Sequence, residues 1–144
     1  MTSSSHTKRA QEAWRLMFDY LMSTRPERDQ SLERRGLTPN DARALSDLDE
    51  KQGRPIGALA RDWGCDPSNA TWIVDRLERG GLALRKASAE DRRVKLVFLT
   101  ARGARVMKEM LAEFHQPPPE MLKLSADELA TLERLLKKLR PSAE

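Results

Sequence analysis

The sequence lacks the features that define secreted, membrane and metal-binding proteins. Its 144 residues include one cysteine and two widely separated histidines, so we expect neither an internal disulfide nor a metal site. No apolar run approaches the roughly 18 residues that a membrane-spanning helix needs, so no membrane association is expected. The N-terminal segment MTSSSHTKRA has no apolar secretion signal, which predicts a cytoplasmic protein.

The motifs of common enzyme chemistry are also missing. There is no glycine-rich phosphate loop, no nucleophile elbow and no pair of carboxylates in an apolar setting. The sequence therefore predicts a protein that is not an enzyme and needs no cofactor. A chain of this length can still bury one ordinary hydrophobic core.

Positive charge is concentrated in the middle of the chain. Residues 1–53 carry 9 basic and 9 acidic side chains, residues 54–105 carry 11 and 6, and residues 106–144 carry 6 and 7. The whole excess, net +5, therefore lies in the middle segment. Such a distribution is typical of a phosphate-binding lobe on a neutral scaffold, although a solvated face with chance asymmetry would look the same.

Apolar spacing and cap signals predict most of the secondary structure. Helical stripes run over 8–24, 39–51, 55–63, 67–79, 104–114 and 126–139. Thr38-Pro39 and Asp66-Pro67 are cap-plus-proline starts, Thr100 can cap the fifth helix, and Ser125 opens a capping box. Pro26 closes or kinks the first helix, which leaves 27–36 as a frayed continuation or a loop. Residues 1–7 are rich in serine and threonine and are expected to form a disordered tail.

The segment from 54 to 103 combines a helix-turn-helix with a hairpin. The turn between its helices is three residues long, Gly64-Cys65-Asp66. Alternating apolar residues over 82–86 and 94–99 predict two antiparallel strands joined by a polar loop. A helix-turn-helix that continues into a charged hairpin is typical of proteins that lay a helix and a wing on DNA.

The ordered combination of motifs resembles the MarR family of bacterial winged helix-turn-helix transcription regulators. The matching residues are Leu37-Thr38-Pro39, Leu77-Glu78-Arg79-Gly80-Gly81-Leu82, Asp91-Arg92-Arg93 and Leu99-Thr100-Ala101-Arg102-Gly103. The resemblance implies a mainly α fold with a small β-hairpin wing: a single domain over 8–144, with a DNA-binding lobe at 37–103. Residues 8–36 and 104–140 would form the dimerisation platform, with Leu129, Leu132, Leu136 and Leu139 on its last helix. A closed monomeric helical bundle is the alternative.

The candidate DNA contacts follow from this arrangement. The first turns of the recognition helix would face the major groove, with Arg76 one turn further on and phosphate contacts on the strand entering the wing. The family's Asp-x-Arg pattern falls on Asp91 and Arg93; it implies that Arg93 enters the minor groove and that Asp91 orients an arginine. The candidate set is Ser68, Asn69, Thr71, Trp72, Arg76, Arg85, Lys86, Asp91, Arg92 and Arg93.

Each of these assignments has a plainer alternative. The wing could be an ordinary solvated turn, Trp72 could pack across the lobe, and Cys65 is more often an inert small residue than an oxidant sensor. The resemblance also implies a small-molecule effector, with Trp14 and Phe18 as candidate pocket residues, although plain packing at the dimer interface fits them better. The predicted function is a ligand-responsive repressor that binds a pseudo-palindromic operator on double-stranded DNA as a homodimer. The alternative function is a winged-helix protein-interaction module without DNA binding.

Overall fold

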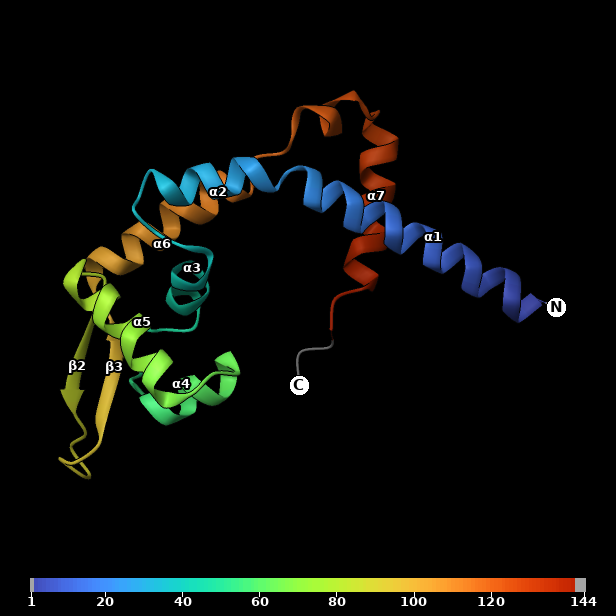
Figure 1. Cartoon of the computed structure of the whole chain (residues 1–144). Coiled ribbons are helices and arrows are strands. Elements are labelled where there is room, and N and C mark those ends of the chain that lie inside the picture. Colours follow the sequence, from blue (N-terminus) through green and yellow to red (C-terminus); the bar gives the residue numbers. More distant parts are fainter. Residues whose placement is uncertain (1, 142–144) are drawn as a thin grey trace. The chain divides into compact units, whose positions relative to one another are not determined.

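The computed structural model describes residues 2–141, and the chain divides after Phe114 into two compact units. The first unit contains α1 (Thr2–Ser23), α2 (Arg25–Glu33), α3 (Pro39–Ser46), β1 (Arg54–Pro55), α4 (Ile56–Trp63), α5 (Pro67–Arg79), β2 (Ala83–Ala87), β3 (Lys95–Leu99) and α6 (Ala101–Phe114). The second unit contains the 3-10 helix η1 (Pro119–Lys123) and α7 (Ala126–Lys138). The fold is mainly α with a small antiparallel sheet, as the sequence predicted (Figure 1).

Local capping chemistry starts α3 and α7 and ends α4 where the sequence indicated. The Thr38 hydroxyl accepts from the Asp41 backbone N–H at 3.1 Å, and the Asp41 carboxylate accepts from the Thr38 N–H at 2.9 Å. Ser125 and Glu128 form the same reciprocal box at the start of α7. Gly64 ends α4 with a left-handed φ of 62°, which glycine adopts without steric cost. These predictions are confirmed.

Four local expectations differ from the structure. Residues 2–7 belong to α1 and not to a disordered tail, since no glycine or proline interrupts the helix there. Residues 25–33 form a separate helix, α2; its proline lies in the first turn, where a missing N–H costs nothing. α3 ends at Ser46, because the Asp49 carboxylate accepts the N–H groups of residues 51 and 52 and closes a turn there. Asp66 precedes α5 as expected but makes no side-chain cap bond.

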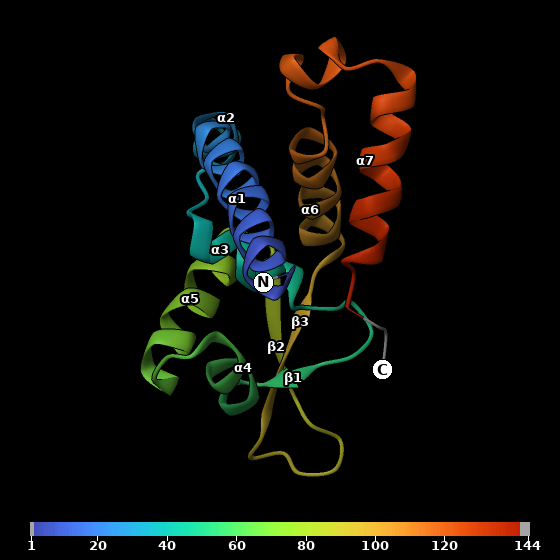
Figure 2. The same ribbon diagram turned by 90° about the vertical axis from the view of Figure 1, so that its right-hand side faces the viewer.

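The sheet has three strands in the order β1-β3-β2, all antiparallel (Figure 2). Residue 85 pairs with residue 97 in the hairpin, and residue 54 of β1 pairs with the other side of residue 97. The sequence predicted β2 and β3 within one residue but did not indicate β1. A two-residue strand has no alternation of its own, and its partner lies about 40 residues away.

The core of the first unit fixes the inner face of the helix-turn-helix. Its fully buried side chains include Leu45 of α3, Leu59 of α4, Val74 and Leu77 of α5, and Val97 of β3. Because α3, α4, α5 and the sheet share this core, the outer face of α5 is held in a defined orientation. No helix among residues 2–141 is long and apolar enough to cross a membrane.

Candidate nucleic-acid interface

The outer face of α5 presents short polar side chains and one large aromatic ring. Ser68 and Asn69 are exposed in the first turns, Thr71 is half-buried, and the Trp72 side chain is 57 % exposed. Ala70, one of the buried residues of α5, lies between them and faces the core. The helix therefore carries hydrogen-bonding groups and one apolar surface on the side away from its core, as a major-groove reading helix requires.

Two arginines of the predicted set are already paired within the lobe. Arg76 donates to the buried carboxylate of Asp41 at 2.8 Å, and its guanidinium lies 5.0 Å from the centre of the Trp72 ring. Arg85 donates to Asp75 at 2.6 Å and to Glu78 at 2.7 Å, and its side chain is only 22 % exposed. Burial alone would lower the pKa of Arg85, but its bonds to the two carboxylates raise that pKa above its ordinary value. A phosphate contact by either arginine would compete with these internal pairs.

The hairpin loop holds one arginine in a fixed and open position. The Asp91 carboxylate accepts from the backbone N–H of Arg93 at 3.1 Å and from its Nε at 3.1 Å. These bonds to Arg93 hold the pKa of Asp91 below its ordinary value. The Arg93 side chain is nevertheless 91 % exposed. The Arg93 Nη2 also donates to Asp91, at 3.3 Å, so the carboxylate orients the guanidinium itself. An oriented and exposed cation of this kind is suited to enter a narrow, negative groove.

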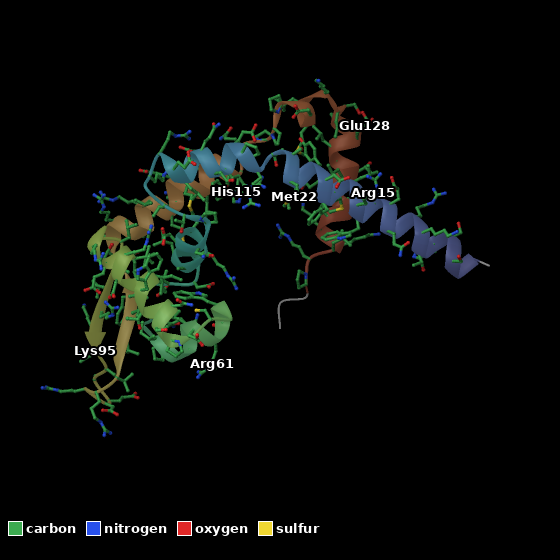
Figure 3. The ribbon with its side chains drawn as sticks, viewed as in Figure 1. Arg15, Met22, Arg61, Lys95, His115 and Glu128 are labelled. Carbon is green, nitrogen blue, oxygen red and sulfur yellow. The ribbon has the colours of Figure 1, made fainter. Side chains whose placement is uncertain are left out.

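Other exposed cations lie on the hairpin and on α4. Arg92 lies beside Arg93, and the ammonium group of Lys86 lies 5.8 Å from the centre of the Phe98 ring. Arg61 on α4 and Lys95 at the start of β3 were not among the residues predicted from the sequence (Figure 3). Both are exposed, and neither pairs with an acidic side chain in the described part of the chain. Lys95 could have been found by its position two residues after Arg93.

A hollow of about 250 Å³ opens between α3, α4 and α5. Its lining residues are Asn40, Arg43, Trp63, Cys65, Asn69, Trp72 and Ile73. Cys65 is half-buried there. Among the described residues, no cluster of histidine, cysteine, aspartate and glutamate could hold a metal ion.

The residues predicted for a ligand pocket and for dimerisation are largely uncovered in the single chain. Trp14 and Phe18 lie on α1 with ring centres 6.3 Å apart, and both are exposed. On α7, Leu129 and Leu132 are half-buried, whereas Leu136 and Leu139 are exposed. Each helix thus carries an apolar surface that its own unit leaves partly open to solvent.

Comparison with known proteins identifies the family. The sequence profile of the MarR family matches residues 37–95. The HTH-type transcriptional regulator MhqR of Bacillus subtilis is 27% identical over 114 residues, which are 78% of this chain and 79% of MhqR. The repressor MdtR of the same organism is 33% identical over 87 residues, 60% of this chain and 56% of MdtR.

Solved structures agree with this identification. The YusO protein of B. subtilis superimposes with a TM-score of 0.73 at 26% identity, over 94% of this chain and 98% of YusO. The apo form of MarR from E. coli gives 0.71 at 28% identity, over 88% and 95%. The MepR–DNA complex of S. aureus, at 21% identity and a TM-score of 0.65 over 87% and 98%, shares the fold. With the winged helix-turn-helix geometry, these matches show a domain of the MarR family of DNA-binding transcription regulators at residues 37–95.

Proposed function

We propose that this MarR-family regulator is a homodimer that binds a pseudo-palindromic operator on double-stranded DNA and represses transcription until a small molecule releases it. The observation that carries the proposal is the wing. Arg93 is almost fully exposed, and its guanidinium is oriented by Asp91 on a hairpin within the basic part of the chain. MepR of S. aureus, which shares this fold, has been solved as a complex with DNA, which supports the same use of this lobe.

The proposed contacts divide between the two grooves and the backbone. Ser68, Asn69, Thr71 and Trp72 on α5 would meet base edges in the major groove, and Arg92 and Arg93 would enter the minor groove. Lys86, Arg61 and Lys95 would contact phosphates, because they are exposed cations of the same lobe. Arg76 and Arg85 would support the lobe through their internal ion pairs.

The homodimer would be built from α1 and α7. The apolar side chains of α1 that remain exposed are Trp14, Leu16, Met17, Phe18, Tyr20, Leu21 and Met22. A contiguous apolar surface of this kind marks an interaction site, and a second copy of the chain would bury it together with Leu129, Leu132, Leu136 and Leu139 of α7. Two lobes in one dimer would read half-sites about one helical turn, roughly 10 bp, apart.

Repression and the response to a ligand are the most specific parts of the proposal. The relative MdtR is named a repressor, which supports that direction of control. Dimer formation would enclose Trp14 and Phe18, so a pocket for a small apolar effector could form there between two chains. An effector bound at that point would change the distance between the two DNA-binding lobes of the dimer.

Binding to DNA from the region upstream of the protein's own gene tests the proposal. Phosphate contacts release condensed counterions, so the affinity should fall steeply as salt is raised, with a slope of about −0.9 per contact on logarithmic axes. An unrelated duplex of equal length gives the non-specific baseline. Absence of binding to both duplexes at low salt would refute DNA binding and favour the protein-interaction alternative.

A further inference from the structure

A buried carboxylate joins the first helix of the DNA-binding lobe to the recognition helix. Asp41 of α3 is 2 % exposed, and its Oδ2 accepts both the Thr38 backbone N–H at 2.9 Å and the Arg76 Nη2 at 2.8 Å. A buried charge is tolerated only with such partners. The same oxygen therefore completes the cap of α3 and holds a side chain of α5.

This pair leaves Arg76 poorly placed to read a base itself. An arginine that recognises guanine presents two parallel N–H groups to the base edge. In Arg76, one Nη2 hydrogen is committed to Asp41, and Nε is buried without a partner. Among residues 2–141, the other buried side-chain atom without a hydrogen-bond partner is Oδ1 of the same Asp41; the unpartnered donor and the unpartnered acceptor thus belong to the two members of this ion pair. Turning the guanidinium toward DNA would leave the Asp41 charge buried and unpaired.

The guanidinium instead supports the exposed aromatic ring of the recognition helix. Trp72 and Arg76 are four residues apart, which places them on one face of α5. The guanidinium carbon lies 5.0 Å from the centre of the indole ring, within the range of a cation–π contact. A ring that stacks on an anchored cation loses less freedom on binding than a free one, and this loss is one of the costs of association.

We propose that Asp41 and Arg76 are positioning residues for sequence readout, through which α3 fixes the indole of Trp72 toward the DNA. Trp72 then contributes preference at one position of each half-site by an apolar contact with a base edge, of the kind that a thymine methyl group offers. Asp41 is buried and touches no DNA, yet operator preference depends on it. This inference rests on the proposed function, sequence-specific binding to duplex DNA.

The test measures the ratio of affinities for two duplexes: one that the parent protein selects from a random-sequence pool, and an arbitrary one of equal length. Arg76→Lys keeps a positive partner for Asp41 but loses the planar stacking surface. We expect this ratio to fall about tenfold in Arg76→Lys and in Trp72→Ala, the size of one lost specific contact. The salt dependence of binding should stay the same, because no phosphate contact is removed. Arg79→Lys, a matched change at an exposed arginine of the same helix, should leave the ratio unchanged.

Asp41→Asn then separates positioning from a general structural role. If Asp41 acts through Trp72, Asp41→Asn lowers the ratio in the parent and has no further effect on it in the Trp72→Ala background. A general loss of structure would weaken binding to both duplexes in both backgrounds. The inference is overturned if Arg76→Lys keeps the affinity ratio of the parent, or if Asp41→Asn lowers that ratio equally in the parent and in the Trp72→Ala background. Either result leaves the proposed DNA binding intact. A parent that selects no duplex overturns the proposed function, and this inference with it.

Discussion

Gly103 lies in the first turn of α6, against the backbone of Leu82. A Cβ at this position would overlap the Leu82 carbonyl oxygen and come within 2.8 Å of Leu99 Cδ1. Backbone atoms cannot rotate out of the way as a flexible side chain can, so helix α6 would have to move away from Leu82. We expect Gly103→Ala to lower the free energy of unfolding by about 1–3 kcal/mol, the usual cost of overpacking. Chemical denaturation of the two proteins measures the difference.

Gly57 of α4 provides the matched control. A Cβ there meets nothing within 4 Å, and alanine is the better helix former. Gly57→Ala should therefore leave stability unchanged or raise it slightly. Equal stabilities of Gly103→Ala and the parent would show that α6 does not approach the backbone of Leu82 so closely.

Single positions also show what sequence reasoning can and cannot supply. The Asp91–Arg93 contact was implied by the resemblance to the MarR family, and the structure brings the two side chains, which lie in one short loop, together. The pairing of Arg76 was not predictable, because Asp41 lies 35 positions earlier and only the folded core brings it near. In the sequence alone, Arg76 and Arg85 look as available to DNA as Lys95 does; only their folded partners distinguish them.

At the scale of elements, one acidic side chain ties α6 to α2. Glu113 of α6 accepts from the Ser31 hydroxyl and pairs with Arg35 and Arg34, each at 2.8 Å. The bond to Arg35, followed by that to Ser31, lowers the pKa of Glu113 from 4.5 to about 2. Because folding lowers this pKa, the carboxylate stabilises the fold fully above pH 4.5, and the contribution is lost as the pH falls toward 2.

Replacing this carboxylate should therefore have a pH-dependent effect. We expect Glu113→Gln to lower the melting temperature at pH 7, and the difference from the parent to shrink between pH 4.5 and pH 2. Glu90→Gln, at an exposed carboxylate of the hairpin loop, is the control and should leave the melting temperature near that of the parent. A difference for Glu113→Gln that stays constant between pH 7 and pH 3 would contradict the assigned pairing.

The elements found from sequence share a local cause. Thr38-Pro39, Gly64 and Ser125 act on backbone groups within a few residues, so α3 and α7 begin, and α4 ends, where predicted. β1 depends instead on pairing with β3, about 40 residues away in the sequence, and no local sequence pattern indicates it. Helix α2 is highly charged with only one buried leucine, so its apolar periodicity is too weak to identify it as a helix.

At the scale of the whole molecule, the exposed apolar surfaces of α1 and α7 predict a dimer at micromolar concentration. Sedimentation should give a mass near twice 16.4 kDa. Replacing Leu132 and Leu136 with aspartate would place two charges in the proposed interface, where burying them is costly. This double variant should lose dimer formation and DNA binding together.

Arg134→Asp is the control, because residue 134 lies two positions from residue 132 and so on the opposite side of α7. It should remain dimeric and bind DNA. A parent mass near 16.4 kDa at micromolar concentration would rule out the proposed homodimer.

The most direct measurement of the central claim, that the wing of this lobe binds DNA, is a titration of the operator fragment with the parent and Arg93→Ala. The Arg93 side chain buries no apolar surface, so the variant should fold normally and lose about 1–3 kcal/mol of operator-binding free energy. Lys123→Ala, a charge change in η1 outside the basic segment, should bind like the parent. Parental operator affinity in a fully folded Arg93→Ala protein would contradict the assignment of this hairpin as a DNA-binding wing.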